Sequence, residues 1–475
     1  MRASQAQRSL EKFRDVTLGV AALGLAALIA PRIPRASAGE IPDPTPVKPA
    51  APPATEPAIT PESPPRVASY TLSAKLDAPR HEITASGTLV FRNVSEAPLA
   101  ELYFHLYLNA FKNEKSLFLR SPFGEGRGGG RAEDWGYIDV AHCRARELDG
   151  VDLWPGRTPG TPSEPDDETD VRVPLPRPLE PGASLTLDLE WKAKLPAVVL
   201  RTGHARDFHF VGQWFPKLAR LEPTGRFAHF PFHPQAEFYA DYGDYDVTLD
   251  VPAAALSAAT GERVESHVRG DRRVERYRAR AVHDFAWTAW PGFRERTARI
   301  DGVAVRLLHP EGYETAAETT LATLARALPL ASRLYGRYPY PTLTAVHPPE
   351  HAAEAGGMEY PTLITTGGPW YLGLLGDRAL ESVTIHELLH QWFYGLVATN
   401  EAAAPILDEG VTSYAELHAL EAAYGPGSAF RGFGVELSAT ALARALSAAR
   451  AEDLPVASPA ADFPGFRALA ALVYS

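Results

Sequence analysis

The sequence predicts a multidomain α+β protein, in which an N-terminal antiparallel β domain precedes a mixed α/β domain that becomes helical toward its end. Apolar and polar residues alternate in short runs between about residues 66 and 298, as in half-buried strands. After about residue 299 the apolar spacing becomes helical. With 475 residues, the chain is long enough for two or three domains, each with its own core.

The composition narrows the function classes. Hydrophobic residues make up 45% and charged residues 22%, as in ordinary globular proteins. The formal net charge of −11 argues against a nucleic-acid partner, which normally meets a basic surface. Cys143 is the single cysteine, which excludes an intrachain disulfide and a cysteine-rich metal site.

Residues 1–38 are expected to be a signal peptide or a signal anchor. Four basic residues lie in the first 15, residues 16–30 carry no charge, and an A-x-A pattern stands at 36–38. The uncharged stretch is shorter than the roughly 20 residues that span a bilayer. Arg32 and Arg35 keep an uncleaved anchor open as the alternative. The sequence therefore predicts an exported protein that is periplasmic, extracellular or membrane-anchored, with membrane contact only through this segment.

Residues 39–65 are expected to be a Pro/Ala-rich linker. Ten prolines lie between residues 41 and 65. Proline fixes φ and lacks an amide donor, so this stretch cannot form helix or sheet and should be an extended tether.

Residues 66–298 form the predicted N-terminal β domain. In SLTLDLEW, residues 184–191, Leu185, Leu187, Leu189 and Trp191 alternate with polar residues. The same pattern predicts further strands at residues 85–91, 245–251 and 283–290.

Residues 299–475 form the predicted second domain. A helix is expected over 313–335, with Leu321, Leu324, Leu328 and Leu330 as its apolar positions. Strands are expected within 338–349 and 356–366, and from about 377 the chain reads as largely helical.

The segment HELLH lies in a predicted helix over residues 378–397. His386 and His390 are four residues apart, so both imidazoles project from one face and could supply two nitrogen ligands to zinc. Glu387 projects about 100° around the axis and could reach a metal-bound water without being a ligand. The motif alone is only suggestive, because two helix histidines can equally be bonded to backbone or solvent.

A third ligand makes the zinc prediction stronger. Eighteen residues separate His390 from Glu409, and a second helix beginning near Leu407 could bring Glu409 to the same metal. Three protein ligands and an open position define a catalytic zinc site. Asp408 and Glu416 could orient ligand histidines from behind, although solvated surface carboxylates are an equal alternative.

These residues resemble a known family. HELLHQWFYGLV and DEGVTSYAE look like the aminopeptidase N and leukotriene hydrolase family of gluzincin zinc metallopeptidases, which have the pattern HExxH-x18-E. GGMEY, residues 356–360, is similar to the GxMEN motif of that family. LYFHLYLNAF, QWFPKLARLE, YDVTLDVP and DFAWTAWPGF look like its N-terminal domain. The resemblance covers about residues 66–475 and implies a saddle-like β domain before a thermolysin-like zinc catalytic domain.

The resemblance also implies roles for single residues. Glu387 would be the general base, Tyr474 would stabilise the oxyanion, and Glu359 would bind the free α-amino group of a peptide. Gly356, Gly357 and Met358 would line the substrate beside Glu359. One Zn²⁺ per chain would be bound by His386, His390 and Glu409.

The sequence departs from the family in three places. Tyr360 stands where the motif usually has Asn, and Ile406 replaces a bulky aromatic residue. The second amine-binding residue of the β domain has no matching motif, although Glu237 and Gln213 are nearby candidates. The chain stops in an apolar helical run, FRALAALVYS, from which a C-terminally truncated catalytic domain is expected.

The predicted function is that of a zinc-dependent aminopeptidase acting on peptides with a free N-terminus. The alternatives are a zinc endopeptidase or another hydrolase on the same scaffold, and a catalytically impaired binding module tethered at the cell envelope.

Overall fold

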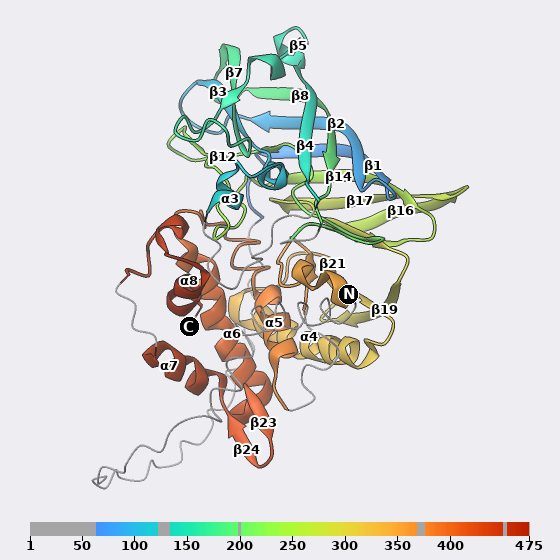
Figure 1. The fold of residues 1–475 in the computed structure, drawn as a ribbon, viewed down its shortest axis with the longest axis vertical. Coiled ribbons are helices and arrows are strands. Elements are labelled where there is room, and N and C mark those ends of the chain that lie inside the picture. The colour runs from blue at the N-terminus through green and yellow to red at the C-terminus, as the bar shows by residue number, and fades with distance from the viewer. Residues whose placement is uncertain (1–62, 122–133, 198–200, 368–375, 450–453, 475) are drawn as a thin grey trace, which may run out of the picture.

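A computed structural model describes residues 63–121, 134–197, 201–367, 376–449 and 454–474 (Figure 1). The predicted signal segment and nearly all of the predicted linker lie outside these residues. Figure 1 shows a β-rich part above a part in which helices predominate, so the mixed α+β class is confirmed. No helix within the described ranges is long and apolar enough to cross a membrane.

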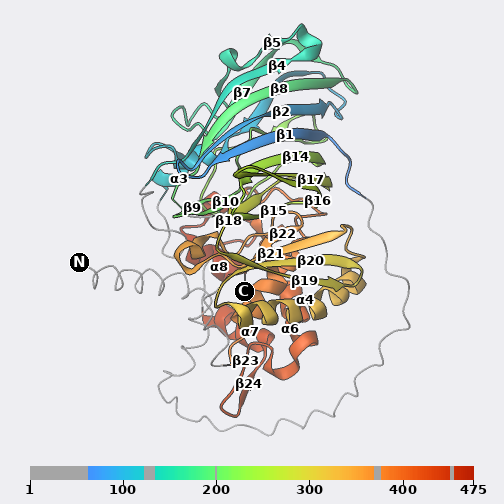
Figure 2. The same ribbon diagram turned by 90° about the vertical axis from the view of Figure 1, so that its right-hand side faces the viewer.

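The β-rich part is built on an eight-stranded sheet with the spatial order β16-β17-β14-β1-β2-β8-β4-β5 (Figure 2). The neighbours pair antiparallel as predicted, except β1 and β14, which run parallel. Burial alternates along β1, β8 and β14 because every second side chain faces the core, whereas β16 at the edge is exposed along its whole length. The bounds are β1 Ala68–Asp77, β2 Glu82–Arg92, β4 Tyr137–Ala145, β5 Val151–Asp152, β8 Ser184–Lys194, β14 Gly243–Pro252, β16 Glu262–Arg269 and β17 Arg272–Val282.

Smaller sheets close the core of this part. One has the order β11-β3-β7-β6 and another the order β15-β18-β10-β9, while β12 and β13 form a hairpin. Their bounds, with those of the short helix α3, are β3 Leu99–His105, α3 Leu117–Arg120, β6 Thr158–Pro159, β7 Asp170–Leu179, β9 Gly203–Ala205, β10 Phe208–Val211, β11 Lys217–Leu218, β12 Arg220–Leu221, β13 Phe227–Ala228, β15 Leu256–Ala259 and β18 Trp287–Trp290. Of the strand predicted at 283–290, only β18 forms.

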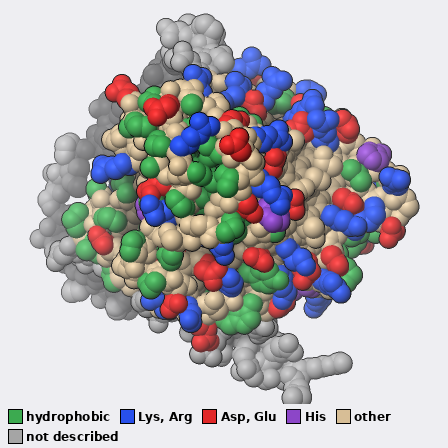
Figure 3. Space-filling view, turned by 90° about the horizontal axis from the view of Figure 1, so that it is seen from above, with side chains coloured by type: hydrophobic (Ala, Val, Ile, Leu, Met, Phe, Trp, Pro, Cys, Tyr) green, Lys and Arg blue, Asp and Glu red, His purple; other side chains and the backbone are tan. Residues whose placement is uncertain are grey.

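The outer face of the molecule seen in Figure 3 carries basic and acidic side chains side by side. Cross-strand ion pairs on the large sheet, such as Arg276 with Asp246 and Arg146 with Asp188, show the same mixing of charge. Such pairs at the surface contribute little to stability.

The second part contains the sheet β19-β20-β21-β22, in which β19 and β20 are antiparallel and the later pairs parallel. Helix α4 connects β20 to β21, as a crossover between parallel strands requires. It covers the predicted helix, and Leu324 and Leu328 are fully buried in it. The bounds are β19 Phe293–Ile300, β20 Val303–Pro310, α4 Glu314–Tyr335, β21 Thr342–Val346, β22 Leu363–Thr365, α5 Ala379–Leu389, α6 Glu409–Tyr424, β23 Phe430–Gly432, β24 Val435–Leu437, α7 Ala439–Ala449 and α8 Phe466–Val473.

The predicted domain boundary between residues 298 and 299 falls inside β19. Since β19 pairs with β20 along its whole length, the chain enters the second sheet earlier than expected, after β18 ends at Trp290. The alternating sequence of β19 resembles that of the strands before it, so the pattern gave no sign of the change.

The helix predicted over 378–397 is too long. Helix α5 ends at Leu389, and the amide of Gln391 then bonds three residues back to the carbonyl of Leu388. Tyr394 has a φ of 112°, which a right-handed helix cannot accommodate. The segment after α5 is therefore a series of turns that bends the chain back toward α6.

The two parts meet along the GGMEY segment. The ring of Tyr360 is buried against Phe210 and Phe238 of the β-rich part, at centroid distances of 5.8 and 6.3 Å. The Thr362 hydroxyl accepts a hydrogen bond of 2.6 Å from the amide of Gly261. Residues around Glu359 are thus held between both parts.

A buried ion pair lies in the β-rich part. Lys217 Nζ is 2.5 Å from Asp284 Oδ2, and both side chains are almost fully buried. Gln213 bonds to both members of the pair. Burial lowers the pKa of Lys217, while Asp284 opposes that shift.

We expect Lys217→Met to lower the free energy of unfolding by about 3–5 kcal/mol, because it leaves the Asp284 carboxylate buried without its cation. Adding Asp284→Asn to this variant should restore most of the loss, since no charge then remains buried. Urea unfolding followed by circular dichroism measures both. Equal losses in the single and double variants would contradict this account.

Candidate active site

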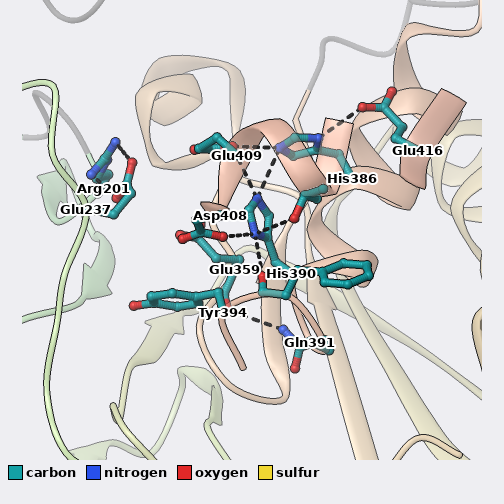
Figure 4. A network of polar contacts seen from close by, with 12 residues as sticks. Arg201, Glu237, Glu359, His386, His390, Gln391, Tyr394, Asp408, Glu409 and Glu416 are labelled. Atoms are coloured by element: carbon teal, nitrogen blue, oxygen red, sulfur yellow. Dashed lines mark hydrogen bonds and ion pairs between the residues drawn. The ribbon is translucent and has the colours of Figure 1, made fainter. Parts of the chain in front are cut away.

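The metal-ligand side chains predicted from HELLH converge in the structure (Figure 4). His386 lies in the last turn of α5, His390 is its C-cap, and Glu409 is the first residue of α6. His386 Nε2 lies 3.0 Å from Glu409 Oε2, and His390 Nε2 lies 3.1 Å from His386 Nε2. His390 Nε2 is 3.3 Å from Glu409 Oε2. These residues form a group that could hold a metal ion.

The spacing of the three atoms fits a tetrahedral ion. Donors about 2.0–2.1 Å from such an ion are separated from one another by about 3.3 Å. The observed separations of 3.0, 3.1 and 3.3 Å are close to this value. Three atoms with lone pairs at these distances repel one another unless protons or a cation lie between them.

The outer nitrogens of both histidines face carboxylates. His386 Nδ1 is 3.0 Å from Glu416 Oε2, and His390 Nδ1 is 2.8 Å from Asp408 Oδ1. Ser382 donates its hydroxyl hydrogen to Glu416 and fixes that carboxylate. A proton on each Nδ1 leaves the Nε2 lone pairs directed at the common point, which is the form a metal requires. The structure therefore places Asp408 and Glu416 behind the histidines rather than at the surface.

The pKa values of the group show that it lacks positive charge without a metal. Burial raises the pKa of Glu387 to about 8 and that of Asp408 to about 7. Burial alone would lower the pKa of His386, but its hydrogen bonds to Glu409 and Glu416 outweigh burial and raise it to about 10. Protons thus supply the missing charge in the metal-free protein, and metal binding would release them.

Glu387 faces the GGMEY segment beside the metal-ligand group. Its carboxylate is buried, and its Oε2 has no hydrogen-bond partner among the described residues. A Cβ on Gly357 would lie 3.8 Å from Glu387 Oε1, and the φ of +70° at Gly357 also favours glycine. A glycine at this position lets the segment pass close to the carboxylate.

Glu359 is also buried, and its Oε1 has no hydrogen-bond partner among the described residues. Gln391, which follows His390, donates to the carbonyl of Glu359 at 3.2 Å and accepts from the amide of Thr362 at 2.7 Å. The same side chain thus joins the metal-ligand segment to the segment that carries Glu359.

Met358, which was predicted to line the substrate, has a side chain that is 1% exposed. That side chain is buried in the hydrophobic core, and the backbone of Met358 pairs with Thr365 in both directions. The amide of Gly357 also bonds to the carbonyl of Thr365. Met358 therefore fixes the segment in place, while Gly357 lies nearest Glu387.

Tyr474 reaches the metal-ligand group from the end of α8. Its ring lies 6.0 Å from the ring of His386 with an interplanar angle of 20°, and 6.1 Å from Phe466. The distance of 65 residues from Glu409 in sequence is closed because α8 packs beside the start of α6, where a Cβ on Gly410 would lie 3.0 Å from the carbonyl of Val473.

Of the two nearby candidates in the β-rich part, Gln213 belongs to the buried Lys217–Asp284 pair. Glu237 reaches the site, where Arg201 holds both of its carboxylate oxygens. Figure 4 shows Arg201 and Glu237 together on one side of Glu409.

Sequence reasoning missed Arg201 and Glu401, because neither belongs to a motif. Glu401 is buried in a turn before α6 and shares a carboxylate cluster with Glu237 and Glu409. Tyr394 was missed as well. It is buried near His390, and its positive φ of 112° is visible in the structure but has no signature in the sequence.

The region that contains the predicted metal ligands is similar to known peptidases. Residues 319–456 match the family model described as the peptidase family M1 domain, which spans α5 and α6 with all three predicted metal ligands. The chain carries an M1 metallopeptidase domain. The mouse protein "Aminopeptidase B" is 35% identical over 103 residues, a match that spans 22% of this chain and 15% of that protein.

Solved structures of an M1 zinc metallopeptidase from Deinococcus radiodurans share the fold. One is 19% identical, covers 86% of this chain and 83% of its own, and has a TM-score of 0.51. A mutant of that enzyme bound to a Tyr-Ser-Ala substrate is 19% identical with the same coverage and a TM-score of 0.53. The likeness extends beyond the M1 domain into the β-rich part.

We expect Glu416→Gln to weaken the binding of a divalent metal ion by about 10- to 100-fold, because His386 loses the carboxylate that orients it. Competition with a chromogenic chelator measures the affinity. Glu421→Gln on the same helix is the matched control, since Glu421 accepts from the amide of Thr440 instead. An affinity of Glu416→Gln equal to that of the control would contradict the role of Glu416.

Proposed function

We propose that the chain is a zinc-dependent aminopeptidase that removes the N-terminal residue of peptides. The observation that carries the proposal is the convergence of His386, His390 and Glu409 on one point, with Glu387 and Glu359 buried beside it. The M1 domain and the neighbours named as zinc metallopeptidases support the choice of zinc. Peptide substrates are supported by the neighbour bound to Tyr-Ser-Ala.

His386, His390 and Glu409 would hold the ion, which fits the two imidazole nitrogens and one carboxylate oxygen that zinc accepts. Bound zinc supplies Lewis acidity, which polarises a carbonyl group and makes water more acidic. Glu387 takes a proton from the attacking water and passes it to the leaving amine.

Glu359 would accept hydrogen bonds from the ammonium group of the peptide. A buried carboxylate whose Oε1 has no hydrogen-bond partner among the described residues favours a charged amine over a blocked one. The hydroxyl of Tyr474 would donate to the oxygen on which negative charge develops. Its ring lies 6.0 Å from the ring of the metal-ligand histidine His386, which supports this role.

Mutation of the general base tests the chemistry. We expect Glu387→Gln to keep its metal and to lose about 10²–10⁴-fold in kcat, because no group then accepts the proton. A fluorogenic aminoacyl amide measures the rate, and elemental analysis measures the metal. Full activity in this variant would refute the mechanism.

Blocking the substrate tests the exopeptidase assignment. We expect the N-acetylated form of the same substrate to react about 100-fold more slowly or worse, because it cannot form the charged hydrogen bonds to Glu359. Equal rates for free and acetylated substrates would favour the endopeptidase alternative. Bound zinc with no turnover of either substrate would favour a binding module.

We also propose that the protein is exported, on the basis of the basic start, the uncharged residues 16–30 and the A-x-A pattern at 36–38. Expression of the full chain followed by cell fractionation should recover it outside the cytoplasm. Mass spectrometry of its N-terminus separates cleavage after residue 38 from an uncleaved anchor. Recovery of the intact chain in the cytoplasmic fraction would exclude export.

A further inference from the structure

A second group of buried acids adjoins the metal ligands. Carboxylate oxygens of Glu237, Glu401 and Glu409 lie within 4.8 Å of one another. All three side chains are at most 4% exposed. Glu359 is close enough that its charge adds to the repulsion at Glu401. Like charges gathered at such distances away from water are costly unless a cation lies among them.

The neighbours of these acids differ. Arg201 holds both oxygens of Glu237, and Glu409 faces His386 and His390. Glu401 is 2% exposed, and its Oε2 has no hydrogen-bond partner among the described residues. The fold therefore buries one carboxylate here and leaves it to be satisfied by something else.

Glu401 is held rigidly in this position. The amides of Ala403 and Ala404 both bond to the carbonyl of Asn400, at 3.1 and 2.9 Å, and form a tight turn around Glu401. The carbonyl of Ala402 accepts from the amide of Ala460 at 3.0 Å, which ties the turn to the segment before α8. Backbone hydrogen bonds thus fix the turn that carries the buried carboxylate of Glu401.

We propose that Glu401 is a specificity-determining residue that receives the ammonium group of the substrate together with Glu359. This rests on the aminopeptidase activity proposed above. An ammonium group has three N–H donors, and Glu359, Glu401 and Glu409 can each accept one. A second metal ion is disfavoured, because Arg201 occupies Glu237 and leaves too few oxygen ligands. Arg201 neutralises Glu237, so Glu401 supplies the charge that Glu237 no longer offers.

Two metal-binding ligands that differ only in the amine test the assignment. Leucine hydroxamate and its des-amino analogue 4-methylpentanohydroxamate both reach the metal through the hydroxamate, but only the first carries an ammonium group. We expect Glu401→Gln in the full, zinc-loaded chain to weaken the binding of leucine hydroxamate by about 10- to 100-fold. The affinity for the des-amino analogue should stay unchanged. Isothermal titration calorimetry measures both affinities. Glu401→Ala should behave in the same way.

Glu359→Gln is the matched comparison. If Glu359→Gln reduces the preference for the amine and both Glu401 variants keep it, Glu401 has no such role, although the proposed function stands. If the wild-type protein binds both hydroxamates equally, amine recognition fails and the assignment of Glu401 fails with it.

Two further measurements separate binding from structure. Glu401→Gln should not lower the melting temperature of the ligand-free protein, because it replaces a buried acid whose Oε2 has no hydrogen-bond partner among the described residues by a neutral side chain of the same shape. A lower melting temperature with equal losses for both hydroxamates would show a structural role and overturn the proposal. Two equivalents of zinc in the wild-type protein and one in Glu401→Gln would identify a second metal site instead.

Discussion

The burial of carboxylates beside the histidine pair is the constraint on which the site depends. Acidic groups prefer water, so each one kept in the interior requires a cation, a donor or a proton. The structure supplies His386 and His390 to Glu409, and it supplies Arg201 to Glu237. The buried acids of the site are Glu237, Glu359, Glu387, Glu401, Asp408 and Glu409.

The excess of negative charge explains why the site is suited to a metal ion and a cationic substrate. A divalent ion at the ligand atoms would balance Glu409 and Asp408. The remaining acids, Glu359 and Glu401, would still favour a positive group beside the metal. In the function proposed above, a single electrostatic imbalance would connect metal binding to recognition of the ammonium group of the substrate.

The sequence predicted the helix of HELLH, the strand-rich first part and the convergence of Glu409 with the histidines, because motif spacing and periodicity are local signals. It did not predict where α5 ends, since Tyr394 at a positive φ has no sequence signature. Nor did it place Glu401, whose neighbours Glu237 and Glu359 come from distant segments of the chain.

The packing of the Tyr360 ring in the aromatic core of the β-rich part suggests a way to disturb the site from a distance. Tyr360 is covalently adjacent to Glu359, and Phe210 and Phe238 hold its ring. A compound that displaced this ring would move the neighbouring carboxylate without touching a metal ligand. The contact between the two parts therefore offers a way to displace Glu359 without chelating a metal ion.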